Sequence, residues 1–62
     1  MFEKEPDLLT RSDCQRLLKV SKSTILKLIH ENYIPAILIN GRFRILKDDL
    51  ILFIENSVVY HR

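Results

Sequence analysis

Residues 21–34 read SKSTILKLIHENYI and carry the pattern of a short helix with two distinct faces. At about 100° per residue, Leu28 and Ile29 fall within roughly 60° of Ile25, so these three side chains form one apolar stripe. The opposite side gathers serine, lysine and histidine side chains. One face is therefore expected to pack inward, while the other presents a basic surface that fits the major groove of DNA, about 12 Å wide.

The boundaries of this helix follow from its flanking residues. Ser21 is a good N-cap, because its hydroxyl can accept from the free N–H groups of the first turn, and Pro35 forbids helix just beyond the other end. The helix is thus about ten residues long. A second helix is predicted over residues 11–18, and Lys19-Val20-Ser21 leaves room for a tight turn alone. This order is the helix-turn-helix arrangement, in which the second helix is the recognition helix.

The first helix begins with its own capping signal. Thr10 is the expected cap, and Asp13 can reach back as a variant of the capping box, with Leu9 and Cys14 at the staple positions. Cys14 then belongs to the buried stripe with Leu17. The alternative, a reactive thiol, lacks a histidine or second cysteine placed to activate it.

A β-hairpin is predicted after the second helix, at the Asn40-Gly41 pair between two apolar runs. A two-residue turn and a three-residue loop place different side chains together on one face of the hairpin. We favour the three-residue loop because it buries more β-branched surface. The two groupings are Ala36, Leu38, Phe43 and Ile45 for the two-residue turn, and Ile37, Ile39, Phe43 and Ile45 for the three-residue loop. In both, Arg42 and Arg44 stay off the Phe43 face and make the hairpin a basic wing, suited to phosphates or a narrow minor groove.

A third helix is expected from Lys47, with carboxylates in its first turn where the helix dipole favours them. Its apolar stripe of Leu50, Phe53 and Ile54 is expected to close the core. Ile51 and Leu52 lie off that stripe. Either they are simply exposed or covered by the Ser57-Val58-Val59-Tyr60 tail, or they form a protein-contact patch.

Composition restricts the function. Sixty-two residues make one small domain, in which an active-site cleft is hard to build. Two histidines, one cysteine and no paired carboxylates with a plausible pocket offer nothing for acid–base, nucleophilic or metal chemistry, so we expect neither an enzyme nor a cofactor. Asp48-Asp49 is better explained as a helix start than as a metal site. The chain has no apolar run long enough for a membrane span, and the acidic N-terminus does not resemble a signal peptide, so a cytoplasmic location is expected.

The charges are segregated along the chain. Residues 15–47 hold seven lysines and arginines against one glutamate, whereas the remaining residues hold three such cations against seven acids. A basic middle between acidic ends attracts a polyanion to one surface. The alternative is that the lysines are scattered without purpose.

Together these features resemble the excisionase-type DNA-binding domain, a winged helix-turn-helix related to the DNA-binding part of the MerR family. The resemblance covers about residues 8–54. It rests on Val20-Ser21-Lys22-Ser23-Thr24-Ile25 and on Ile34-Pro35-Ala36 followed by Gly41-Arg42-Phe43-Arg44-Ile45. The expected fold is α+β and mostly helical: two N-terminal helices, a two-stranded wing and a C-terminal helix. The expected domain limits are a flexible lead-in over residues 1–7, the DNA-binding domain over 8–56 and a tail over 57–62.

The resemblance implies a bacterial or phage-derived protein that bends double-stranded DNA and helps a tyrosine recombinase (an integrase) to excise a mobile element. We expect a monomer in solution that binds DNA cooperatively. The alternatives are a small MerR-like transcriptional regulator and a protein-interaction module. From the residues and the resemblance, the expected DNA contacts are Lys19, Lys22, Ser23, Thr24, Lys27, His30, Arg42 and Arg44, with Ile51 and Leu52 as the protein contact. His30 has the alternative of being an ordinary solvent-facing side chain.

Overall fold

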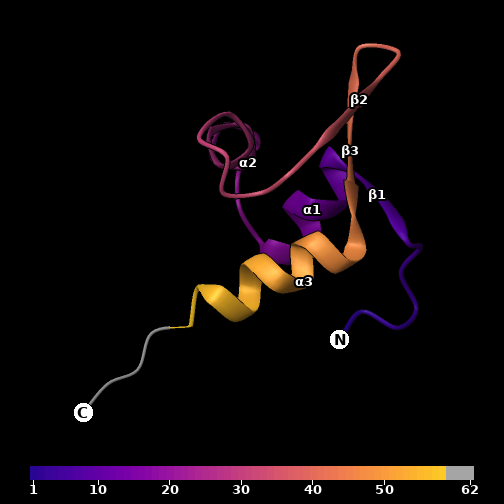
Figure 1. Cartoon of the computed structure of the whole chain (residues 1–62), viewed down its shortest axis with the longest axis vertical. Coiled ribbons are helices and arrows are strands. Elements are labelled where there is room, and N and C mark those ends of the chain that lie inside the picture. Colours follow the sequence, from indigo (N-terminus) through magenta and orange to yellow (C-terminus); the bar gives the residue numbers. More distant parts are fainter. Residues whose placement is uncertain (59–62) are drawn as a thin grey trace.

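A computed structural model describes residues 1–58 of the chain. Residues 59–62, which make up most of the expected tail, lie outside the described part. Three helices and a three-stranded antiparallel sheet of strand order β1-β3-β2 confirm the expected α+β winged architecture (Figure 1). In chain order the elements are β1 (Leu8–Thr10), α1 (Arg11–Leu18), α2 (Lys22–His30), β2 (Ile37–Ile39), β3 (Arg42–Leu46) and α3 (Lys47–Asn56).

The start of α1 confirms the predicted capping box. The Thr10 hydroxyl accepts the Asp13 N–H at 3.0 Å, and the Asp13 carboxylate accepts the Thr10 N–H at 3.0 Å. Each side chain thus accepts a hydrogen bond from a backbone N–H group that has no carbonyl partner within the helix. The helix ends where Lys19 adopts the left-handed conformation, with φ 57° and ψ 46°, which turns the chain sharply towards α2.

The limits of α2 also follow from local signals. The Ser21 hydroxyl accepts the Thr24 N–H at 3.2 Å, as expected of an N-cap. At the other end, the N–H groups of Tyr33 and Ile34 both donate to the Leu28 carbonyl, at 2.9 and 3.3 Å. These bonds fold the chain back before Pro35 and direct it towards the hairpin.

The hairpin register differs from the one we favoured. Ile39 pairs with Arg42, so Asn40-Gly41 is a two-residue turn, and the three-residue loop was wrong. Asn40 has φ 52° and Gly41 has φ 71°, the paired positive values of the turn whose twist matches the flanking strands. Ile37 and Ile39 consequently share the face of the arginines and remain about 45% exposed instead of being buried. Leu38, on the Phe43 face, is exposed as well, so β2 buries neither of its faces.

A strand that the sequence analysis did not predict completes the sheet. β1 pairs with β3, with Leu9 opposite Ile45 and Thr10 opposite Arg44. The wing is therefore the free end of a three-stranded sheet, not an isolated two-stranded hairpin. Its tip projects beyond the helices (Figure 1), while its base is held to the first helix through β1.

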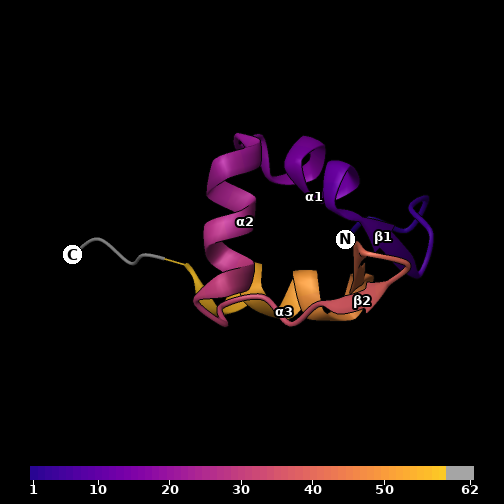
Figure 2. The same cartoon turned by 90° about the horizontal axis from the view of Figure 1, so that it is seen from above.

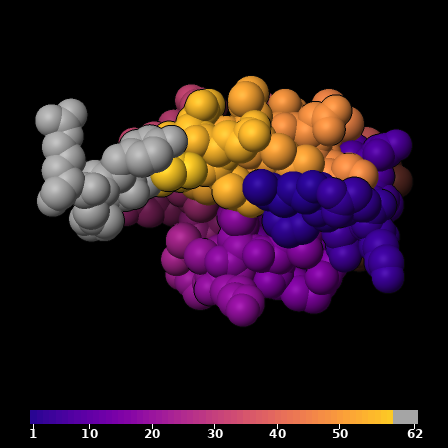
Figure 3. Space-filling model, turned by 90° about the horizontal axis from the view of Figure 1, so that it is seen from below, coloured from indigo at the N-terminus to yellow at the C-terminus, as the bar shows by residue number. Residues whose placement is uncertain are grey.

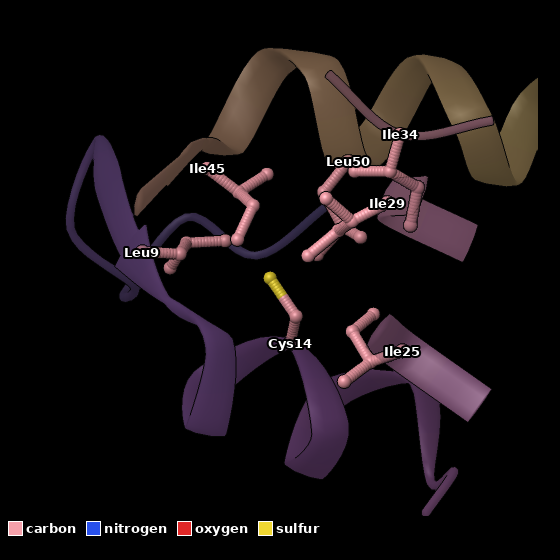
Figure 4. Packing of buried hydrophobic residues seen from close by; sticks show 7 residues of the cluster. All are labelled: Leu9, Cys14, Ile25, Ile29, Ile34, Ile45 and Leu50. Carbon is pink, nitrogen blue, oxygen red and sulfur yellow. The ribbon is translucent and has the colours of Figure 1, made fainter. Parts of the chain in front are cut away.

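The core brings together side chains from every helix and from the sheet (Figure 4). Cys14 points into this cluster, which confirms it as a core residue. Partly buried side chains, including Leu17, Phe53 and Ile54, pack around it. The buried members are Leu9, Cys14, Ile25, Ile29, Ile34, Ile45 and Leu50.

The N-terminal segment lies on the face where α1 meets the start of α3 (Figure 3). Glu5 binds the Arg16 guanidinium at 2.6 Å, and the Asp7 carboxylate lies 3.4 Å from the Lys47 ammonium. Backbone bonds add to these ion pairs, since the Lys47 N–H donates to the Asp7 carbonyl at 2.8 Å. Residues 1–7 therefore occupy the side of the molecule away from the wing.

Candidate nucleic-acid interface

The helix α2 and the hairpin lie on the same side of the molecule, with α3 on the other (Figures 1 and 2). In Figure 2, α2 runs from α1 at its N-terminal end towards the chain leading into β2 at its other end. Near the C-terminal end of α2, the His30 ring meets the Phe43 ring of β3 edge to face, with 6.0 Å between the ring centroids. The C-terminal end of the predicted recognition helix therefore contacts the wing directly.

The predicted DNA-contacting residues fall on three connected parts of this side. Lys19 lies in the turn, five of the residues lie on α2, and two lie on β3. All are exposed except Arg44, which is half-buried. In chain order, the α2 residues are Lys22, Ser23, Thr24, Lys27 and His30, and the β3 residues are Arg42 and Arg44.

Three hydroxyl groups cluster at the N-terminus of α2. The Ser21 oxygen lies 3.1 Å from that of Ser23 and 3.0 Å from that of Thr24. A hydroxyl can donate one hydrogen bond and accept two, so Ser21, which also accepts the Thr24 N–H, is fully used, whereas Ser23 and Thr24 keep capacity for a partner outside the protein. The first turn of α2 thus presents an oriented group of donors and acceptors, which is the chemistry that reads base edges.

The electrostatics separate two classes of cation. Arg16 and Lys47, which belong to the basic middle of the sequence, are paired with acids of the N-terminal segment. Within residues 1–58 no ion pair involves the cations of the turn, α2 or the wing. Those unpaired cations are Lys19, Lys22, Lys27, Arg42 and Arg44. Folding therefore pairs the two basic side chains that contact the N-terminal segment and leaves those of the turn, α2 and the wing free of ion pairs.

A groove of about 370 Å³ separates the wing from the helices. Its walls come from β3, from Leu26 of α2 and from the first residues of α1. Arg11 and Ser12 line it beside Arg42 and Arg44, and neither was predicted as a site residue. The missed signal is their position: the start of α1 directly follows β1, which pairs with β3, so Arg11 is carried to the foot of the wing.

Two groups near this region, the Asp13 carboxyl and the Cys14 thiol, have shifted pKa values. The hydrogen bond from the Thr10 backbone N–H lowers the pKa of Asp13, and Arg16 adds a smaller effect of the same sign. Burial raises the pKa of the Cys14 thiol to about 11, so the thiol stays protonated at neutral pH. Neither group faces the groove; the first fixes the start of α1 and the second fills the core.

The predicted protein contact lies elsewhere, on α3. Leu52 is 55% exposed, whereas Ile51 is half-buried. Within residues 1–58, no helix combines the length and apolar character needed to cross a bilayer, and no cluster of histidine, cysteine and acidic residues could hold a metal ion.

Comparison with known proteins supports the arrangement. The family model described as a helix-turn-helix domain matches residues 8–57, most of the chain. Helix-turn-helix domains bind DNA and typically carry no catalytic activity, so this match supports DNA as the partner. A search of curated proteins found no match, and neither did a search of solved structures.

Proposed function

The chain belongs to the helix-turn-helix domain family, and from this premise we propose that it is a sequence-specific, excisionase-type protein. It bends double-stranded DNA and assists a tyrosine recombinase in excising a mobile element. The observation that carries DNA binding is the unpaired set of cations on α2 and the neighbouring wing, whereas Arg16 and Lys47 are paired with Glu5 and Asp7 of the N-terminal segment. The excisionase role rests on the resemblance of the recognition-helix entry and the wing sequence.

In this proposal the recognition helix lies in the major groove. Ser23, Thr24, Lys27 and His30 contact base edges. The phosphates are neutralised by the turn, the helix and the wing, through Lys19, Lys22, Lys27, Arg42 and Arg44. The domain spans residues 8–56, between a lead-in over 1–7 and a tail over 57–62.

The partner assignments are part of the same proposal. The protein is a cytoplasmic monomer of bacterial or phage origin that binds neighbouring sites on DNA cooperatively. Ile51 and Leu52 contact the recombinase or the next copy. A Leu52→Ser variant should then retain the affinity of an isolated site but lose cooperativity or stimulation of excision.

The first test is the salt dependence of duplex binding. If the five unpaired cations each neutralise one phosphate, log K should fall with log salt at a slope of about −4.5. Affinity should then fall roughly 500-fold between about 50 and about 200 mM salt. The measurement is fluorescence anisotropy of a duplex selected from a random pool. Failure to bind or select any duplex would refute DNA binding.

The second test concerns Lys27. Lys27→Ala should reduce the salt slope by about 1 if the ammonium contacts phosphate, and should relax sequence preference if it contacts a base. Lys4→Ala is the matched control, because Lys4 is an exposed lysine of the N-terminal segment. An unchanged slope together with an unchanged footprint would remove Lys27 from the interface.

The excisionase role has its own readout. Circularly permuted duplexes should show bending on binding, and addition of the protein should stimulate excision by the recombinase encoded beside its gene. Binding without bending or stimulation would instead indicate the regulator alternative.

A further inference from the structure

The groove beside the wing contains an arginine that the proposed DNA contacts leave out. Arg11 lines it together with Arg42 and Arg44, so three arginines from two elements line one hollow of about 370 Å³. Within residues 1–58, no acidic side chain forms an ion pair with any of the three. Guanidinium groups match the geometry of phosphate and carboxylate oxygens, so a hollow lined by three arginines is suited to an anionic ligand.

Hydrogen bonds hold two of these side chains in place. The Arg11 guanidinium donates to the Gln15 amide oxygen one turn along α1, and the Arg44 guanidinium donates to the Phe43 carbonyl at 3.1 Å. Each bond uses one of the five guanidinium donors and leaves the others available. Both side chains are half-buried, so less conformational freedom is lost when they bind.

The opposite wall of the groove adds neutral donors. Ser12 contributes an exposed hydroxyl, and the N–H groups of Arg11 and Ser12 open α1, where the helix provides no carbonyl partner. Backbone N–H groups, a hydroxyl and planar guanidinium groups together are the usual donors to phosphate oxygens.

We propose that this groove binds one backbone phosphate of duplex DNA, with Arg11 as a phosphate contact beside the wing arginines. The proposal rests on the DNA-binding function proposed above and adds a contact to it. The helix α2 and the hairpin lie on the same side of the molecule (Figure 2). A phosphate bound in the protein groove would therefore lie between the part of the DNA backbone that contacts the wing and the DNA major groove that α2 enters. Such a contact sets the register of the protein on DNA and carries no sequence information.

The test compares Arg11→Gln with Arg16→Gln by the salt dependence of duplex binding. Both residues lie on α1, but Arg16 pairs with Glu5 and lies outside the groove. Arg11→Gln should weaken binding to all sequences alike and reduce the salt slope by about 0.9. The affinity lost by this variant should therefore be about 3.5-fold greater at about 50 mM than at about 200 mM salt. Arg16→Gln should change neither quantity.

Neutral methylphosphonate linkages identify the source of the phosphate. One linkage should weaken wild-type binding and have no further effect on Arg11→Gln, which couples that phosphate to Arg11. An Arg11→Gln variant with wild-type affinity and slope would overturn the groove proposal. So would Arg11 amide and side-chain shifts that respond to inorganic phosphate but not to duplex, since the ligand would then be a free anion. If wild-type protein bound no duplex at all, the failure would lie with the proposed function instead.

Discussion

Lys19 combines a strained backbone with a predicted DNA contact, so one substitution should move stability and binding in opposite directions. Its φ of 57° and ψ of 46° place it in the left-handed region, which costs a residue with a side chain about 1–2 kcal/mol. Glycine removes that strain but loses about 0.5–1 kcal/mol to the greater freedom of the unfolded chain. Because Lys19 is exposed, no packing is lost. Lys19→Gly should therefore stabilise the fold by about 0.5–1 kcal/mol.

For a domain of this size, that gain corresponds to a rise in Tm of about 2–8 °C, measured by circular dichroism. The same variant loses one cation, so its salt slope for duplex binding should fall by about 0.9. Lys19→Ala is the matched control: it removes the same charge but retains the strained backbone, so its stability should stay within about 0.5 kcal/mol of wild type. The reasoning is refuted if the glycine variant is less stable than the alanine variant. A difference in DNA affinity between the two variants would show that the charge is not what matters at this position.

Three further predictions concern the support of the interface. Because Cys14 is fully buried with a pKa raised to about 11, a thiol reagent at pH 8 should label native protein far more slowly than urea-unfolded protein, and equal rates would place the thiol outside the core. Gly41→Ala should cost about 1 kcal/mol in urea unfolding, since Gly41 has φ 71° but open space around a Cβ; a much larger loss would indicate an unseen contact. Because folding lowers the pKa of Asp13, ionisation of this carboxylate stabilises the fold above the usual titration range of aspartate, and the stabilisation is lost as pH falls through the lowered pKa. The unfolding free energy of wild type should therefore fall below about pH 4. Asp13→Asn should be less stable than wild type at pH 7 and should show a flatter dependence of stability on pH below about pH 4.

The sequence determined the features that depend on neighbours within one helical turn. Thr10 and Asp13 lie three residues apart, as do Ser21 and Thr24, so their hydrogen bonds form wherever those segments become helical. Residues 11–18 were accordingly predicted with the bounds that α1 has. Asn40-Gly41 likewise specified a hairpin, because both residues tolerate positive φ.

The hairpin register shows where pattern reasoning failed. Counting buried β-branched side chains favoured the three-residue loop, but Ile37 and Ile39 lie opposite Arg44 and Arg42 on the exposed face. All of β2 stays exposed, Leu38 on the Phe43 face at 64% included, because the hairpin projects beyond the helices (Figure 1). The sequence pattern could not supply that information.

Tertiary structure alone decided which charges remain free and which residues share the groove. The pairing of Leu9 with Ile45 joins segments far apart in the chain and carries Arg11 to the wing. The same folding brings Asp7 to Lys47 and so removes that lysine from the basic surface. Helix caps and turns depend on interactions between neighbouring residues, which the sequence displays directly. Strand pairs and ion pairs between distant residues depend on how the elements pack, which the order of residues does not display.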